Sequence, residues 1–298
     1  MAAPAGRRYR VTWLDAGLVV AVVLAVGYLA WRSEAVVRYR WNWAAIAPYI
    51  LRYDDGAHRW VANLLLQGLF ETLRIALWSG LLALLFGVVM GLCRVSRNLF
   101  LRLIARSYVE LIRNIPPLVF IFVFYFFLTG QVTPYLGLDD RVRAASPGTL
   151  AALDLLFGQP RFLPAVASAI ICLSLFEGAY VTEIVRAGVQ SIEKGQWEAA
   201  ASLGMKRLAA LRLVVLPQAL QRVVPPLAGQ FISLVKDSSI VSLISIQELA
   251  FLGGEVSAST GRVFEVWIAV SVLYFLVCFG LSLAFGRLER RLSRGLAR

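Results

Sequence analysis

Residues 176–217 read FEGAYVTEIVRAGVQSIEKGQWEAAASLGMKRLAALRLVVLP, and this stretch decides the fold. An apolar run ends at Arg186, a polar segment of mostly helix-forming residues follows, and the chain then becomes apolar again. In a membrane protein, such a segment forms a short helix outside the bilayer between two spans. Glu198-Ala199-Ala200 predicts a helix of small residues, which Gly204 can end in a left-handed conformation. Leu216-Pro217 suits the start of the next helix, where proline needs no N–H.

The composition indicates an integral membrane protein. Of the 298 residues, 59% are hydrophobic and 16% are charged, whereas about a quarter of the residues in a soluble domain are charged. The formal net charge is +12, but the arginines flank apolar runs and do not form one stripe, so we expect no nucleic-acid partner. The three cysteines form no CxxC pair and the single histidine cannot form a His cluster, so we expect no metal site.

Six apolar stretches are long enough to cross a hydrocarbon core of about 30 Å. The first, residues 14–31, follows a basic start formed by Arg7, Arg8 and Arg10. It lacks a clear cleavage site, so it is read as a transmembrane helix and not as a signal peptide. The other expected spans are residues 68–93, 107–128, 162–188, 215–235 and 263–286.

Three segments between the spans have their own expectations. Residues 32–67 are polar and aromatic, which favours a surface segment, with an interfacial helix as the alternative. Residues 129–161 form a second outer segment, and residues 238–252 are too short for a crossing and suit a re-entrant or interfacial helix. Pro116-Pro117 should bend the third span, either as a packing kink or as a bend along the substrate path.

The distribution of basic residues predicts the orientation. With both termini inside, the inner segments hold 19 of the 30 Lys and Arg residues and the outer segments hold 10. Lysine and arginine concentrate on the cytoplasmic side of membrane proteins. The charge bias therefore places both termini, and Glu198 with its helix, in the cytoplasm.

The spacing of Glu198-Ala199-Ala200, Gly204, Val214 and Leu216-Pro217 resembles the coupling motif of ABC importer permeases. Further motifs resemble the polar amino acid branch of that family. They are Gly178-Ala179-Tyr180, Glu183-Ile184-Val185-Arg186-Ala187-Gly188, Lys194-Gly195-Gln196, Leu216-Pro217-Gln218-Ala219, Lys236-Asp237-Ser238-Ser239, Tyr108-Val109-Glu110 and Arg113-Asn114-Ile115-Pro116-Pro117. The resemblance covers residues 68–286. It implies an all-α polytopic protein of the bacterial inner membrane with a five-helix permease core, to which residues 14–31 add a sixth helix.

This resemblance implies three regions and a set of partners. The regions are an N-terminal helix with its outer segment (1–67), the permease core (68–286) and a basic cytoplasmic tail (287–298). The partners are an ATP-binding subunit, an extracytoplasmic substrate-binding protein and a second permease chain, identical or related. No GxxxxGK[ST] phosphate loop occurs in this chain, so ATP and magnesium are expected on the partner ATPase. The expected ATPase-coupling residues are Glu198, Ala199, Ala200, Gly204 and Lys206, with Arg207 as a second rim charge.

Polar residues within the expected spans suggest a substrate path. Glu177 lies near the middle of the fourth span, where an ionisable group is costly and indicates a functional site. It could receive a substrate cation, or it could pair with an arginine of another helix. Tyr180 lies on nearly the same face, although a core tyrosine is an equal alternative. Gln230, Ser233 and Lys236 are spaced three apart on the fifth span, and Lys236 could meet a substrate carboxylate or pair with Asp237.

Two other functions must be weighed against ATP-driven import of polar amino acids. A secondary transporter or channel would work without an ATPase, but the sequence shows no obvious inverted repeat. A membrane-embedded enzyme would need clustered histidines, cysteines or carboxylates, and only Glu177 lies deep in a span. We therefore expect no catalytic residue. The sequence does not identify the amino acid that is carried.

Overall fold

The computed structural model describes residues 13–32, 39–56 and 58–294, and it divides the chain into two units, residues 1–45 and 46–298. The first unit contains helix α1 (Trp13–Arg32) and a 3-10 turn, η2 (Trp43–Ala45). Helix α1 covers the expected first helix, with Asp15 in its first turn and Arg32 in its last. The basic start at Arg7, Arg8 and Arg10 lies outside the described residues.

The second unit begins with a short helix and a β-hairpin. Helix α2 (Ala47–Ile50) leads into strand β1 (Leu51–Asp54), which pairs in antiparallel register with β2 (Arg59–Ala62), so that Tyr53 faces Trp60. This hairpin is not among the elements expected in residues 32–67. Its signals are present in the sequence, because Asp55-Gly56 is a turn pair between two segments of aromatic and β-branched residues.

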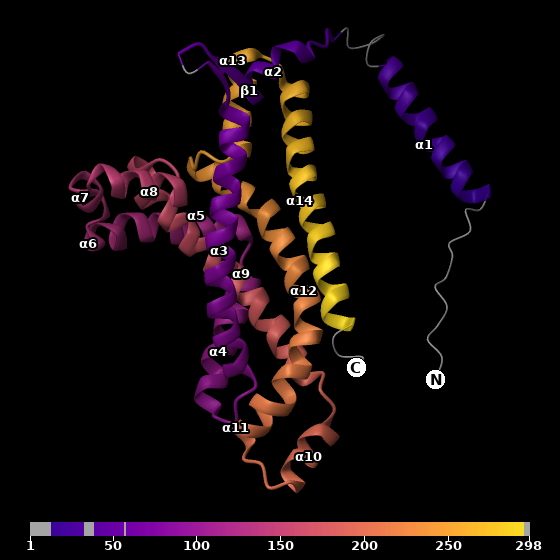
Figure 1. The fold of residues 1–298 in the computed structure, drawn as a ribbon, viewed down its shortest axis with the longest axis vertical. Helices are drawn as coiled ribbons and strands as arrows, with labels where there is room; N and C mark the ends of the chain where they lie inside the picture. The colour runs from indigo at the N-terminus through magenta and orange to yellow at the C-terminus, as the bar shows by residue number, and fades with distance from the viewer. Residues whose placement is uncertain (1–12, 33–38, 57, 295–298) are drawn as a thin grey trace. The chain divides into compact units, whose positions relative to one another are not determined.

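Within the described residues, five helical segments are long and apolar enough to cross a membrane: 64–94, 117–136, 160–190, 207–244 and 263–290. Their main helices are α3 (Leu64–Arg94), α5 (Pro117–Phe127), α9 (Leu163–Gln190), α12 (Leu216–Asp237) and α14 (Val263–Arg294). They form a bundle in which α3 lies beside α9 (Figure 1). These helices confirm the all-α polytopic fold.

Small residues allow α3 and α9 to pack closely. Ser79, Ala83, Gly87 and Gly91 recur every four residues along α3, and all four are buried. A Cβ atom added at Gly87 would lie 2.5 Å from the Cβ of Val181. Helices in membranes associate through such small-residue faces, because close backbone approach maximises van der Waals contact.

The expected third span, residues 107–128, is wrong in its bounds. Helix α4 (Leu99–Arg113) ends before the prolines, and α5 begins at Pro117, so the pair separates two helices. Proline is tolerated at the first helical position because its missing N–H has no intrahelical partner there. Helix α4 instead starts eight residues earlier than expected, where the Asn98 side chain accepts hydrogen bonds from Phe100 N and Leu101 N.

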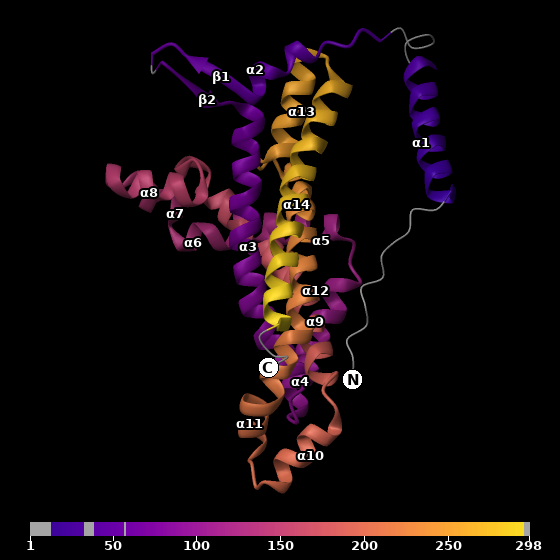
Figure 2. The ribbon, with the colours of Figure 1, turned by 45° about the vertical axis from the view of Figure 1, so that its right-hand side comes forward.

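The outer segment 129–161 forms an arm of short helices that projects sideways from the bundle (Figures 1 and 2). Its elements are the π-turn η3 (Leu128–Val132), α6 (Thr133–Leu136), α7 (Leu138–Arg143), α8 (Pro147–Phe157) and η4 (Pro160–Phe162). Two side chains of α3 hold the end of α8. Arg74 Nε donates to Leu155 O at 3.1 Å, and Trp78 Nε1 donates to Leu156 O at 2.8 Å. These bonds satisfy carbonyls that have no partner at a helix C-terminus.

The segment that precedes α12 is more helical than expected. After α10 (Lys194–Ser202), helix α11 (Arg207–Ala210) continues through the π-turn η5 (Leu211–Val215) directly into α12. Leu216-Pro217 starts α12 as predicted, although α12 continues the helical run of α11 and η5. The π-turn immediately before it shifts the hydrogen bonds, so that Leu216 N bonds to Leu211 O. Such π-turns are local insertions in an otherwise α-helical run.

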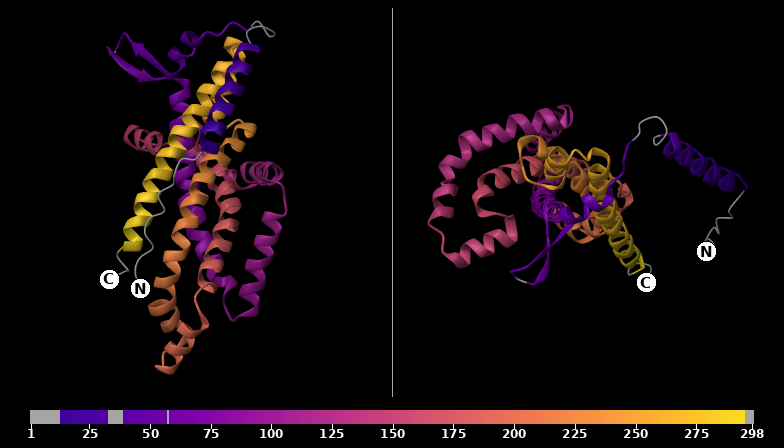
Figure 3. Two further views of the ribbon diagram at one scale, coloured as in Figure 1. Left: turned by 90° about the vertical axis from the view of Figure 1, so that its right-hand side faces the viewer. Right: turned by 90° about the horizontal axis from the view of Figure 1, so that it is seen from above.

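Residues 238–252 form no crossing of their own, in agreement with the sequence. The 3-10 helix η6 (Ser238–Ile244) ends at Ser245 with φ 62°, and α13 (Leu249–Thr260) then packs against α3 and α14 (Figure 3). The expected bounds of this element are wrong, because two short helices replace one.

Glu248, which is buried, caps α13 and ties it to its neighbours. Its Oε1 accepts from Phe251 N at 2.9 Å, and its Oε2 accepts from Thr72 Oγ1 at 3.1 Å and from Tyr274 OH at 2.6 Å. Burial raises the pKa of Glu248, and the donated hydrogen bonds oppose this rise. One carboxylate therefore holds α3, α13 and α14 together.

Candidate functional site

The first candidate site is the elbow formed by α10 and α11. Figure 2 shows this elbow at the end of the bundle opposite the β-hairpin. Helix α10 ends in a Schellman motif, in which Gly204 N bonds to Ala201 O at 2.9 Å and Met205 N bonds to Ala200 O at 3.1 Å. Gly204 has φ 75°, which confirms the predicted left-handed end of the helix.

The elbow presents only part of the predicted coupling set on its surface. Glu198, Ala199, Gly204 and Lys206 are exposed, whereas Ala200 is 3% exposed and packs inside the chain. Leu203, which the sequence reasoning did not select, is 81% exposed at the tip. An apolar residue directly before a helix-ending glycine was the available signal. The exposed surface therefore combines small, apolar and charged groups around Leu203.

Contacts with two long helices hold the elbow in place. Trp197 and Leu211 pack against a buried cluster that includes Val189 of α9 and Ala219 of α12. Gln218 Nε2 also donates to Gln196 Oε1 at 3.1 Å. Because these contacts join α10 to both α9 and α12, a force applied to the elbow would be transmitted to both helices.

An ion-pair network lies where α3 ends. Glu183 Oε1 accepts from Arg94 Nη2 at 2.9 Å, and its Oε2 accepts from Arg186 Nε at 2.9 Å. The i,i+3 pair of Glu183 and Arg186 was predicted, and the structure confirms it. Arg94 was not predicted as a partner of Glu183, because only the close contact of α3 with α9 brings the two residues together.

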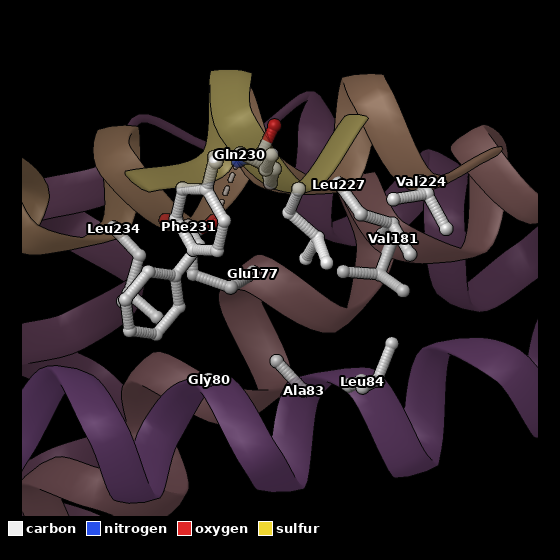
Figure 4. A pocket seen from close by; sticks show the side chains of 13 residues that line it. Gly80, Ala83, Leu84, Glu177, Val181, Val224, Leu227, Gln230, Phe231 and Leu234 are labelled. Atoms are coloured by element: carbon white, nitrogen blue, oxygen red, sulfur yellow. Dashed lines mark hydrogen bonds between the residues drawn. The ribbon is translucent and has the colours of Figure 1, made fainter. Parts of the chain in front are cut away.

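The second candidate site is a cavity of about 220 Å³ around Glu177 (Figure 4). It is lined by residues of α3, α9, α12 and α14. Glu177 is 1% exposed, and its Oε2 accepts a hydrogen bond from Gln230 Nε2 at 2.6 Å. In the part of the chain that the structure describes, Oε1 of Glu177 has no hydrogen-bond partner. The remaining lining is mostly apolar, including Val181, Phe231 and Phe285.

Of the predicted path residues, the structure brings only Glu177 and Gln230 together at this cavity. Tyr180 instead lies near the end of α4, where the guanidinium of Arg113 is 5.3 Å from the centroid of the Tyr180 ring. Ser233 and Lys236 do not line the cavity, and Lys236 is exposed. Among the ion pairs of the described residues, none joins Lys236 to Asp237. The polar stripe predicted on α12 therefore splits between two environments.

Comparison with known proteins gives a consistent set of similarities. A family model described as "Binding-protein-dependent transport system inner membrane component" matches residues 83–294. The chain is 34% identical to the probable glutamine ABC transporter permease protein GlnM of Bacillus subtilis (strain 168), over 78% of this chain and 94% of that protein. It is 32% identical to the glutamine transport system permease protein GlnP of Escherichia coli (strain K12), over 85% of this chain and 99% of that protein.

A solved structure shows the same similarity in three dimensions. It is described as the crystal structure of an amino acid ABC transporter with histidines, and its matched chain is 30% identical to this one. The TM-score is 0.61, and the match covers 76% of this chain and 94% of the other.

Proposed function

The chain belongs to the family of binding-protein-dependent transport system inner membrane components, in its polar amino acid branch, and from this we propose that it is the permease of an ATP-driven amino acid importer. As a multi-pass protein of the inner membrane, it would provide the translocation path. It would not hydrolyse ATP itself, because ATP and magnesium would bind to a separate ATPase subunit. An extracytoplasmic binding protein would deliver the substrate, and a second permease chain would complete the path.

The observation that carries this proposal is the elbow at α10 and α11. A coupling element must be exposed to its partner and also rigidly connected to the spans that move. Leu203 and Ala199 meet the first condition, and the packing of Trp197 against α9 and α12 meets the second. Glu198 and Gly204 would contribute to the same contact. Lys206 and Arg207 would act as rim charges, which mainly affect the rate of encounter.

We further propose that Ala200 supports this contact from inside. Its side chain is buried beneath the exposed residues of α10, so a larger residue there would displace the helix. Both termini and the elbow would lie in the cytoplasm, as the distribution of lysine and arginine indicates.

Glu177 and Gln230 would form part of the substrate path. A buried carboxylate with one unpaired oxygen is costly unless a cation or donor completes it. The amide of Gln230 fixes one oxygen, and a cationic group of the substrate would bind the other. Tyr180, Ser233 and Lys236 would contact the substrate elsewhere along the path, since α12 carries Ser233 and Lys236 away from the Glu177 cavity.

Reconstitution tests this function. The chain, co-purified with its ATPase, is placed in liposomes with its substrate-binding protein, and uptake of labelled polar amino acids is measured. We expect uptake that requires ATP and stops with orthovanadate. Uptake that proceeds without the ATPase and is insensitive to orthovanadate would instead identify a secondary transporter or channel.

A further inference from the structure

A basic cavity lies beside the elbow, separate from the Glu177 cavity. It has a volume of about 690 Å³ and is formed by the end of α3, the loop and start of α4, the end of α9, and α10 with α11 and η5. Five of its lining residues are cationic: Arg94, Arg97, Arg102, Lys194 and Arg207. No Asp or Glu is among its lining residues. The cavity therefore has a strongly positive lining.

Most of this charge is not neutralised by the chain itself. Arg94 is paired with Glu183. Among the described residues, however, Arg97, Arg102 and Lys194 make no side-chain hydrogen bond or ion pair, and all three are exposed. Arg207 lies 5.3 Å from the ring centroid of Trp197. Three cations thus remain available to an anionic ligand.

The uncharged walls of the cavity are mostly apolar, with Ser96 and Gln190 as the polar exceptions. Leu92, Val95 and Ile192 line it beside the cations. The adjacent helix α4 exposes Phe100 (68%) and Leu103 (50%). This combination lies at the end of α3, where the apolar second half of that helix meets Arg94. A ligand that fits these walls has an anionic head and an apolar body.

The cavity shares only Arg207 with the proposed ATPase-coupling residues. Trp197 lines the cavity, whereas Ala199, two residues later on α10, is exposed and lies on the opposite side of the helix. Neither Leu203 nor Gly204 lines the cavity. An ATPase bound at the tip of the elbow would therefore leave most of the cavity lining uncovered.

We propose that this cavity binds the phosphate headgroup of an anionic phospholipid. Arg97, Arg102 and Lys194 would hold the phosphate, and Leu92, Val95 and the exposed face of α4 would contact the glycerol and acyl chains. Basic pockets between membrane helices bind anionic headgroups in this way. The bound lipid would bridge α4 and the elbow.

The test measures lipid retention on the full importer complex. The complex is reconstituted in nanodiscs of equal phosphatidylglycerol and phosphatidylcholine, extracted into detergent, and analysed by native mass spectrometry. We expect retained phosphatidylglycerol on the wild-type chain. The triple variant Arg97→Gln, Arg102→Gln, Lys194→Gln should weaken this preference by about tenfold or more. The control Arg59→Gln, Arg141→Gln, Arg143→Gln removes the same charge from exposed positions elsewhere and should retain the lipid.

Three results would overturn the proposal. One is equal retention by the triple variant and the control. Another is displacement of phosphatidylglycerol by millimolar inorganic phosphate, which would show a site for small anions and not for lipid. The third is a cross-link from Arg97→Cys to the ATPase together with no retained lipid, which would show that the ATPase fills the cavity. Because lipid retention is measured without transport, none of these results depends on the proposed import activity.

Discussion

Gln230 Nε2 lies 2.6 Å from Glu177 Oε2, and this hydrogen bond joins α12 to α9 at a buried carboxylate. Of the two carboxylate oxygens, Oε1 has no partner in the described chain. The pair therefore combines a fixed geometry with an unsatisfied acceptor, which is the arrangement that a cationic ligand group would complete.

Glu177→Gln should lower the uptake of cationic amino acids by about tenfold or more, because loss of a buried charge partner costs 2 kcal/mol or more. The uptake of neutral amino acids should change much less. The measurement is competition of labelled substrates in proteoliposomes. Asp139→Asn, on the exposed arm, is the matched control. Equal uptake of all substrates by Glu177→Gln would remove this residue from the path.

Leu203→Asp should uncouple transport from ATP hydrolysis. Leu203 is 81% exposed, so the substitution leaves the buried core of the chain intact and changes only the surface offered to the ATPase. We expect normal membrane insertion but loss of binding-protein-stimulated ATPase activity. Leu155→Asp, at a 72% exposed position on the arm, should retain coupling.

Gly204→Asp should have the same effect by a different route. Gly204 has φ 75°, so a residue with a Cβ strains the turn that ends α10. Transport should fall while the chain still inserts, as measured by membrane fractionation and uptake. Normal transport by Gly204→Asp would count against the coupling role of the elbow.

Gly87→Ala should destabilise the contact between α3 and α9. An added Cβ would lie 2.5 Å from Val181, so one helix must move, and overpacking of this kind costs about 1–3 kcal/mol. Gly280→Ala is the control, because nothing lies within 4 Å of a Cβ added there. Thermal unfolding in detergent should show a lower midpoint for Gly87→Ala only. Equal midpoints for the two variants would contradict the close packing.

Glu248→Ala should destabilise the protein more than Tyr274→Phe. The first removes the cap of α13, worth about 1 kcal/mol, and also leaves the buried hydroxyls of Thr72 and Tyr274 without their acceptor, at about 1–3 kcal/mol each. The second removes one donor and leaves the cap intact. Thermal unfolding measures both variants, and the reverse order of stability would contradict this role of Glu248.

The sequence predicted the helices better than it predicted their ends. Long apolar stretches identified α3, α9, α12 and α14, because hydropathy depends only on composition within a window. The bounds of the third span were wrong because Pro116-Pro117 was read as a bend within one helix. The β-hairpin was missed because its aromatic residues also fit an interfacial segment.

By itself, the sequence determined the family, the polytopic helical fold and the left-handed end of α10 at Gly204. These properties follow from local composition, motif spacing and the conformational freedom of one residue. Only the tertiary structure decided that Ala200 is buried, that Arg94 joins Glu183, and that Gln230 meets Glu177 while Tyr180, Ser233 and Lys236 do not. The physical reason is that such contacts join residues far apart in the chain, and helix packing, which no local window contains, sets which faces meet.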